Sequence, residues 1–322
     1  MMKVIITVSP GNSGGGAVHD FIYQNTEFKS PFKGHEFRLI TDPDGIINIH
    51  RNFFRNYSLN NSIDALERFK QYTNAFSKLK MKVGKEKKEI FNKNFLILRD
   101  NYLKKIIKTS YSALPQFHYL KLDFKRKFFF NIKSKFYNKN KNRLNETFVP
   151  IFYDEKKFII ETKIFLKKLI KTHTIKNNKI ILDQSISIWN LDEIFKYFED
   201  VKIILVTRDP RSIFYSMKSR SSNSYPGHDV KKFVIWYKFI MEKFNKNFKQ
   251  SKYRNKILKI NFEKFVSDKS TKKKILKFIN AKEINNIFNF KKSRNNAFKA
   301  KKLLNKNHQE YIKKNLKKNL QW

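Results

Sequence analysis

A short apolar run followed at once by a cluster of glycines places the strongest constraint on how this chain folds. Residues 1–8 end in the run KVIITV, which is typical of a buried parallel strand. The chain has only eight glycines, and four of them lie within residues 11–16. Residues 17–24 then have the pattern of a helix. The order of strand, glycine-rich loop and helix predicts the first half of a β-α unit.

A loop of this kind is suited to hold a phosphate or sulfate group. Glycine adopts positive φ angles and lets an anion approach the backbone closely, and the following helix adds its positive end. We therefore expect an anion cradle here, with a flexible turn as the alternative. The residues assigned to the cradle are Gly11, Asn12, Ser13, Gly14, Gly15, Gly16 and Ala17.

Two common nucleotide-binding loops do not match this one. A Walker A loop needs Lys and then Ser or Thr after its second glycine, and here Ala17 and Val18 stand in those places. The G-x-G-x-x-G spacing of dinucleotide-binding loops is not met either. The sequence thus disfavours an ordinary ATPase and a dinucleotide-dependent enzyme.

Helix and strand patterns alternate along most of the chain. Strands are expected at residues 37–40, 179–182, 202–206 and 257–260. Helices are expected at residues 62–80, 87–110, 158–172, 191–198, 211–219, 229–248, 263–265 and 271–279, and in the last 30 residues. This alternation predicts an α/β fold of the P-loop-like three-layer α/β/α type, with a mostly parallel central sheet.

Residues 80–150 have a different composition from the rest. They are heavily basic and aromatic and poor in strand signals. We expect a single α/β domain over residues 1–322, in which residues 80–150 form a helical basic insert or lid. A flexible basic arm is the alternative for this stretch.

The composition narrows the chemistry further. Lys and Arg number 70 against 27 acidic residues, a formal net charge of +43, which predicts an anionic partner or a generally charged surface. The absence of cysteine excludes a disulfide scaffold, a cysteine zinc site, an iron–sulfur cluster and a thiol nucleophile. No group of His, Asp and Glu has a spacing that favours a metal site, so no metal is expected.

A second candidate anion site follows the strand expected at residues 202–206. Arg208 and Arg211 flank Asp209-Pro210, and Ser216 lies eight residues after Arg208 on the next helix. A guanidinium and a hydroxyl placed in this way supply several donors to one phosphate. The alternative is a strand-to-helix turn that carries an exposed ion pair.

Residues 201–218, VKIILVTRDPRSIFYSMK, resemble the 3′-phosphate-binding segment of sulfotransferases that use 3′-phosphoadenosine 5′-phosphosulfate (PAPS). The resemblance implies that Arg208 and Ser216 bind the 3′-phosphate of PAPS and of its product PAP. It also implies that the glycine loop holds the 5′-phosphosulfate. Residues 258–266 resemble a later family segment, and residues 292–296 resemble the loop that covers the cofactor, which assigns Ser293 and Arg294 to PAPS binding.

The loop departs from the family pattern at three positions. Asn12 stands where the family has Lys or Arg, and Gly15 and Gly16 replace two threonines. Asn12 still donates a hydrogen bond to the leaving group but brings no charge, so stabilisation of the transition state is expected to be weaker. The cation either comes from elsewhere in the chain or is missing.

Residues 34–40 resemble the stretch that carries the catalytic base in tyrosylprotein-type sulfotransferases. The resemblance implies that Glu36 takes the proton of the acceptor hydroxyl and that Arg38 contacts the acceptor. The alternative is a surface ion pair. Asp183 at a strand end and His228 in a later loop are further candidates for acceptor binding, whereas His19 is expected to pack against the sheet.

The most consistent reading is a cytoplasmic sulfotransferase that transfers a sulfuryl group from PAPS to an acceptor hydroxyl, with a saccharide as the expected acceptor. The alternatives are a P-loop nucleotide kinase or NTPase, a basic nucleic-acid-binding protein, and a degenerate PAPS binder that no longer transfers. No specific nucleic acid is expected, because the basic residues are spread over the whole chain. No transmembrane segment is expected, while peripheral membrane contact stays open.

Overall fold

The computed structural model describes residues 1–32, 35–83, 86–91, 94–113, 115–136, 147–174, 177–219 and 225–322. Gly34, which belongs to the sequence pattern around Glu36, lies outside the described residues. The chain forms two compact units. Unit 1 comprises Met1–Arg38 and Ile170–Trp322, and unit 2 comprises Leu39–Leu169.

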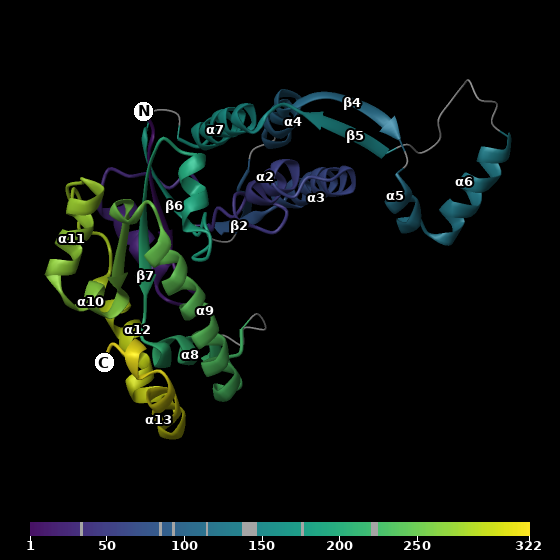
Figure 1. The fold of residues 1–322 in the computed structure, drawn as a ribbon. Helices are drawn as coiled ribbons and strands as arrows, with labels where there is room; N and C mark the ends of the chain where they lie inside the picture. Colours follow the sequence, from purple (N-terminus) through teal and green to yellow (C-terminus); the bar gives the residue numbers. More distant parts are fainter. Residues whose placement is uncertain are drawn as a thin grey trace. The chain divides into compact units, whose positions relative to one another are not determined.

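Unit 1 is built on a parallel four-stranded sheet (Figure 1). The strands are β1 (Lys3–Val8), β6 (Lys179–Asp183), β7 (Asp200–Thr207) and β8 (Ile257–Asn261), in the order β6-β1-β7-β8. β1 is central, with Ile6 opposite Leu182 on one side and Ile203 on the other. Because all four strands run the same way, the loops after them meet at one edge of the sheet.

Helices cover both faces of this sheet. On one face, α1 (Gly15–Asn25), α10 (Phe262–Ser267), α11 (Lys269–Ile279) and α12 (Phe290–Leu303) share a core with alternate strand residues such as Leu258 and Ile260. Lys259 points the other way, with its ammonium 5.2 Å from the ring of Phe244 on α9 (Val230–Gln250). The expected α/β fold with a mostly parallel central sheet is confirmed. Unit 1 also contains α8 (Pro210–Ser219), α13 (Lys306–Asn315) and the short 3-10 helices η1 (Leu191–Lys196), η2 (Arg254–Lys256) and η3 (Lys317–Asn319).

Unit 2 is mainly helical and has its own aromatic core. Its helices are α2 (Ile46–Phe54), α3 (Leu59–Ser77), α4 (Phe95–Ile106), α5 (Gln116–Lys121), α6 (Phe124–Phe136) and most of α7 (Glu155–Lys171). Two antiparallel pairs, β2 (Lys80–Val83) with β3 (Glu86–Glu89) and β4 (Ile107–Ala113) with β5 (Thr147–Phe152), accompany them. Tyr102 stacks on Phe165 at 4.7 Å between ring centroids. Among the described residues, no helix combines the length and the apolar character that crossing a bilayer requires.

Three predicted elements differ from the structure. The strand expected at 37–40 is a turn, and only Glu36 pairs, as a single bridge to Asp183. The helix expected at 87–110 covers only Phe95–Ile106 and is followed directly by β4, so the basic stretch also contains strands. The segment 191–198 is helical but forms the 3-10 helix η1.

Candidate functional site

The candidate site lies at the carboxyl edge of the unit 1 sheet. The glycine loop follows the central strand β1, and Arg208 follows its neighbour β7. Adjacent parallel strands bring the residues that follow them close together, so the fold alone places the two predicted anion sites side by side.

The glycine loop has a backbone that side chains would obstruct. Asn12 and Gly14 have left-handed φ angles of 62° and 89°. A Cβ on Gly14 would lie 2.6 Å from the ring of Phe262, and one on Gly11 would lie 2.7 Å from the ring of Tyr225. The loop therefore runs between two aromatic rings, which explains the need for glycine at both positions.

Polar groups in the loop are suited to an anion. The hydroxyl of Ser13 is buried and has no hydrogen-bond partner among the described residues. Gly15 and Gly16 form the first turn of α1, where backbone amides have no acceptor within the helix. These donors and the positive end of α1 fit the phosphosulfate group that the sequence predicts for this loop.

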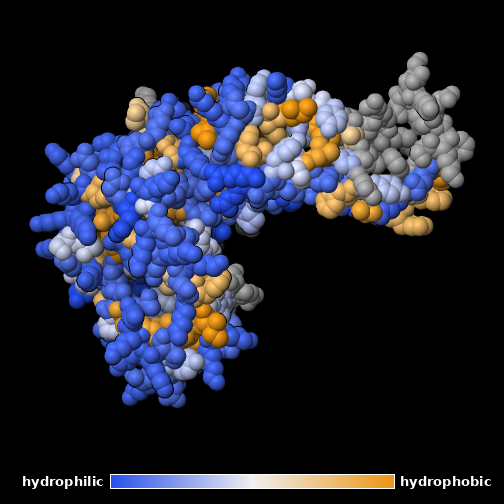
Figure 2. Space-filling view, viewed as in Figure 1, coloured by the Kyte–Doolittle hydropathy of each residue, from blue (hydrophilic) through white to orange (hydrophobic). Residues whose placement is uncertain are grey.

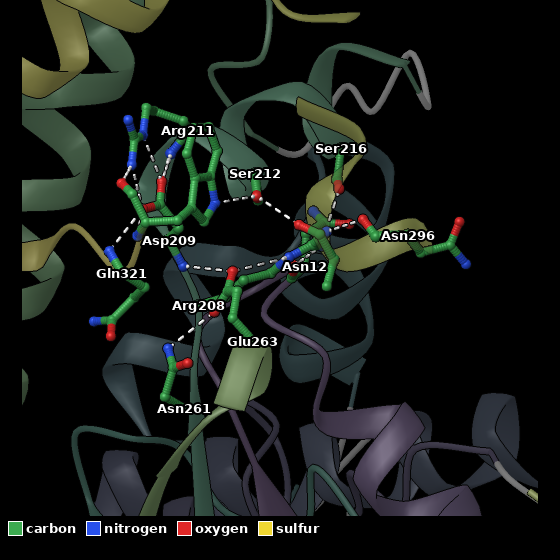
Figure 3. Close-up of polar contacts among 12 residues, drawn as sticks. Asn12, Arg208, Asp209, Arg211, Ser212, Ser216, Asn261, Glu263, Asn296 and Gln321 are labelled. Carbon is green, nitrogen blue, oxygen red and sulfur yellow. Dashed lines mark hydrogen bonds and ion pairs between the residues drawn. The ribbon is translucent and has the colours of Figure 1, made fainter. Parts of the chain in front are cut away.

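Arg208 connects the two predicted sites directly (Figure 3). Its side chain is buried, and one terminal nitrogen donates to the backbone oxygen of Asn12 at 3.0 Å and to the hydroxyl of Ser216 at 3.1 Å. The other donates to the backbone oxygen of Asn296 on α12 at 2.6 Å. The guanidinium also lies 5.4 Å from the centre of the Phe262 ring. One cation thus joins the glycine loop, α8 and α12.

A buried network holds the backbone after β7. Glu263 accepts a hydrogen bond from the Asp209 amide at 3.1 Å and one from the Asn261 side chain at 2.9 Å. Burial raises the pKa of Glu263, and the nearby charge of Arg208 opposes that rise. Arg211 donates two hydrogen bonds to the fully buried Asp209 and lies 3.5 Å from a ring of Trp322. Arg211 is therefore a structural partner of Asp209, in a turn that is buried and not exposed.

A second carboxylate, Asp183, lies on the opposite side of the glycine loop from β7. It ends β6 and accepts a hydrogen bond from Thr7 at 2.9 Å, and its other oxygen lies 3.7 Å from where a Cβ on Gly16 would be. Burial raises the pKa of Asp183 to about 6, although His19 and Thr7 act to lower it. His19 itself is buried and bonded to Ser30 at 3.1 Å, which agrees with the packing role expected for it.

Glu36 and Arg38 lie next to Asp183 in the structure but are exposed. The two side chains form an ion pair at 3.3 Å, and about half of each is accessible. The backbone of Phe37 donates to the backbone oxygen of Asp183 at 2.9 Å, so Glu36 flanks the end of β6.

The remaining predicted residues are farther along the chain. His228 is exposed, in a segment whose Tyr225 packs on Gly11. Ser293 and Arg294 were expected in a covering loop, but they lie within helix α12, which begins after Asn289 caps it through the Lys292 amide. Arg294 is exposed and, with Phe290 and Lys302, lines an open hollow of about 950 Å³ along α12.

Sequence reasoning missed several residues that shape the site. Tyr225 and Phe262 pack under the loop, and Glu263 and Asn261 hold the turn after β7. Asn296 lies in the segment 292–296 that resembles the cofactor-covering loop, but the resemblance did not indicate that its backbone oxygen accepts from Arg208. Asn261, Phe262 and Glu263 lie in the segment 258–266, which resembles a later segment of the family, but that resemblance assigned no contact to them.

A scan against family models matches residues 118–283 to a model described as the Sulfotransferase family, just over half of the chain. The chain belongs to the Sulfotransferase family. The matched stretch of this sulfotransferase contains Arg208 and Ser216, while the glycine loop lies before it. No curated protein matches the chain in a sequence search.

Solved structures of sulfotransferases are similar to the chain over most of its length. The sulfotransferase domain from the curacin biosynthetic pathway has 11% identity and a TM-score of 0.42, covering 98% of this chain and 97% of that one. Sulfotransferase STF1 from Mycobacterium tuberculosis H37Rv has 10% identity and a TM-score of 0.39, covering 91% and 70%. Sulfotransferase STF9 from Mycobacterium avium has 11% identity and a TM-score of 0.34, covering 94% and 69%.

Proposed function

We propose that this sulfotransferase uses PAPS as donor and transfers its sulfuryl group to an acceptor hydroxyl. The observation that carries the proposal is the contact of Arg208 with both Asn12 of the glycine loop and Ser216 of α8. A donor with one phosphate on the 3′ and another on the 5′ position of the same ribose needs two anion sites close together, and this cation borders both.

The residues of unit 1 have distinct roles in the proposal. Ser13 and the amides of Gly14, Gly15 and Gly16 hold the 5′-phosphosulfate, with Gly11 and Ala17 completing the loop. Arg208 and Ser216 hold the 3′-phosphate, and Ser293 and Arg294 of α12 extend the site. When bound, PAPS supplies a sulfuryl group whose transfer forms a bond from sulfur to the acceptor oxygen and breaks the bond from sulfur to the bridging oxygen of PAP.

The proton of the acceptor hydroxyl goes to a carboxylate beside the end of β6. We assign it to Glu36, with Arg38, Asp183 and His228 as acceptor contacts. Glu36 is exposed and so accessible to a large acceptor, and Asp183 adds a buried oxygen beside the loop. A saccharide, which offers several O–H donors to these carboxylates, is the acceptor class we propose.

Asn12 bears on the rate of the reaction. Its side chain is uncharged, and Arg208 contacts the loop through the Asn12 carbonyl. Removing one preorganised hydrogen-bond donor from an oxyanion site costs about 10²–10³ in rate, so a weaker donor at the leaving group slows transfer. We therefore propose slow transfer, in which Asn12 donates one hydrogen bond to the bridging oxygen.

Thermal unfolding with PAP tests donor binding. Saturating PAP is expected to raise the melting temperature, because a ligand that binds only the native state stabilises it. Arg208→Ala and Ser216→Ala should reduce the shift, and the exposed Arg254→Ala should keep it. The Ser216 variant matters because Arg208 is buried and its loss threatens folding. A shift with Mg²⁺-ATP but none with PAP would overturn the proposal in favour of a kinase or NTPase.

Turnover of ³⁵S-labelled PAPS separates an enzyme from a degenerate binder. Transfer of the label to an added saccharide acceptor by the wild-type chain, lost in Glu36→Gln, is the expected result. A chain that binds PAP, shows no turnover, and gains turnover in Asn12→Lys would instead be a binder that has lost transfer. Asn12→Asp is the matched control. It keeps the size of the side chain but adds a negative charge, where Asn12→Lys adds a positive one.

A further inference from the structure

The helices α5 and α6 of unit 2 expose a group of large apolar side chains. Phe124 is 83% exposed, Leu120 and Phe129 are each 60% exposed, and Phe128 is 53% exposed. We call Phe117, Leu120, Phe124, Phe128, Phe129 and Ile132 the α5–α6 patch. Figure 2 shows apolar residues gathered along one edge of these helices. A contiguous exposed group of this kind marks an interaction surface.

The patch has a defined geometry. Phe124, Phe128 and Ile132 are four residues apart and so form one stripe along α6. The rings of Phe124 and Phe128 stack with their centroids 6.4 Å apart. Tyr119 of α5 donates a hydrogen bond to Asn131 of α6 at 3.2 Å, which fixes the two helices to each other.

Helix α5 is in turn anchored to α3. Lys121 forms an ion pair with Asp64 at 2.5 Å, and His118 is buried 3.6 Å from the same carboxylate. Because these polar contacts hold the inner side of α5, Phe117 and Leu120 are left on its accessible side.

Cations border the apolar stripe. Lys125, Arg126 and Lys127 follow Phe124 directly, and Asp123 is the one acidic residue between 116 and 132. The Lys121 ammonium lies 4.4 Å from the Phe117 ring. Aromatic rings flanked by Lys and Arg are the pattern of a helix that lies in a membrane interface, with its rings among acyl chains and its cations among phosphates.

We propose that the α5–α6 patch binds the surface of a bilayer that contains anionic lipids. Charge complementarity favours anionic headgroups. Leu120 and Ile132 favour lipid over nucleic acid, because aliphatic side chains offer no face for base stacking. Every patch residue belongs to unit 2, whereas the residues assigned to PAPS belong to unit 1.

Co-sedimentation of the full chain with vesicles tests the proposal. The probes are vesicles of phosphatidylcholine alone and vesicles with 30% phosphatidylglycerol, in about 0.1 M salt, where the Debye length is about 10 Å. The wild-type chain should sediment with the anionic vesicles and only weakly with the neutral ones. The triple variant F124S/F128S/F129S should bind the anionic vesicles at least tenfold more weakly, and K125Q/R126Q/K127Q should lose the preference for anionic lipid.

The matched control is I235S/F239S on α9. These two residues are 69% and 55% exposed, and a lysine also lies by the Phe239 ring, but they are outside the patch. The control should bind like the wild type, and circular dichroism should show all variants folded, because the changed side chains are exposed or, for Lys127, half-buried.

Four results would each overturn the proposal. The first is a wild-type chain that fails to sediment with anionic vesicles, and the second is a triple serine variant that binds them as well as the wild type does. The third is a triple variant that loses affinity for a single-stranded oligonucleotide as strongly as for vesicles, which would make the patch a nucleic-acid surface. The fourth is a wild-type dimer and a monomeric triple variant in size-exclusion chromatography without lipid, which would make the patch a contact between two copies.

Discussion

The buried carboxylate of Asp183 lowers the stability of the folded chain at neutral pH. Its carboxylate is buried beside the glycine loop with one hydrogen bond, from Thr7. Burial raises its pKa from the usual 3.8 to about 6, so the folded chain holds the proton more tightly than the unfolded chain does. A buried carboxylate that disfavours folding at neutral pH is typical of a functional site.

The pH dependence of stability should follow from this shift. A raised folded-state pKa means that the contribution of Asp183 to stability is intact below pH 4 and is lost as the pH rises through about 6. Asp183→Asn should therefore match the wild type near pH 4 and exceed it by up to about 3 kcal/mol above pH 7. Urea unfolding of both chains at several pH values measures this, and a difference that does not change with pH would contradict it.

Gly14 allows a second test at a single residue. Its φ of 89° and the 2.6 Å approach of the Phe262 ring both oppose a side chain. Gly14→Ala should cost about 1–3 kcal/mol in the free energy of unfolding and abolish the thermal shift caused by PAP. Gly16→Ala is the control for stability, because a Cβ there meets nothing closer than 3.7 Å and alanine favours the helix. Equal stability of the two variants would show that the loop is not held as described.

At the scale of elements, α12 holds Arg208 in place. Ala297 is fully buried and its carbonyl accepts a hydrogen bond from Ser212 of α8 at 2.9 Å, next to the Asn296 carbonyl that accepts from Arg208. Ala297→Leu should push α12 from α8, cost about 1–3 kcal/mol, and weaken PAP binding. Lys299→Leu adds the same side chain at an exposed position and should change neither. Calorimetric titration with PAP checks both variants, and unchanged affinity in Ala297→Leu would contradict the positioning role.

The elements also show what the sequence can predict. The four parallel strands were predicted because continuous apolar runs can only be buried. The strand expected at 37–40 failed because the carbonyls of Leu39 and Ile40 accept from Ile46 and Ile47 at the start of α2. β4 was missed because its partner β5 begins far along the chain, although Ile107, Thr109 and Tyr111 alternate as strand residues do.

The candidate site was predicted only where a motif carried it. The glycine cluster and the pair Arg208 and Ser216 are visible in the sequence because each lies within a short segment. Phe262 and Tyr225 pack against glycines more than 200 positions away. Phe262 lies in the segment 258–266, but that resemblance does not say that its ring packs on Gly14, and Tyr225 belongs to no motif. Contacts between residues so far apart in the sequence depend on the strand order β6-β1-β7-β8. That order cannot be deduced from the local sequence patterns.

At the scale of the whole molecule, the net charge of +43 affects the association rate of anionic ligands. A positive field raises the association rate of an anionic ligand by about 10-fold or more at low salt, and salt screens it. The association rate of PAP should therefore fall by about tenfold between 50 mM and 500 mM salt, while its dissociation rate changes little, because Arg208 is buried. Stopped-flow fluorescence measures both rates, and a salt effect on dissociation alone would contradict this.

The two units offer a way to locate PAP binding within the whole molecule. All three tryptophans, Trp189, Trp236 and Trp322, belong to unit 1, so tryptophan fluorescence reports the unfolding of that unit alone. Far-ultraviolet circular dichroism also reports the helices of unit 2, which has its own aromatic core. PAP at a hundredfold excess over its Kd should stabilise unit 1 by about 2.7 kcal/mol. The midpoint of unfolding followed by fluorescence should then rise by more than the midpoint of unfolding followed by ellipticity. If the ellipticity midpoint rises as much, the units unfold together, and if only the ellipticity midpoint rises, PAP binds in unit 2 and the assignment to the glycine loop and Arg208 is wrong.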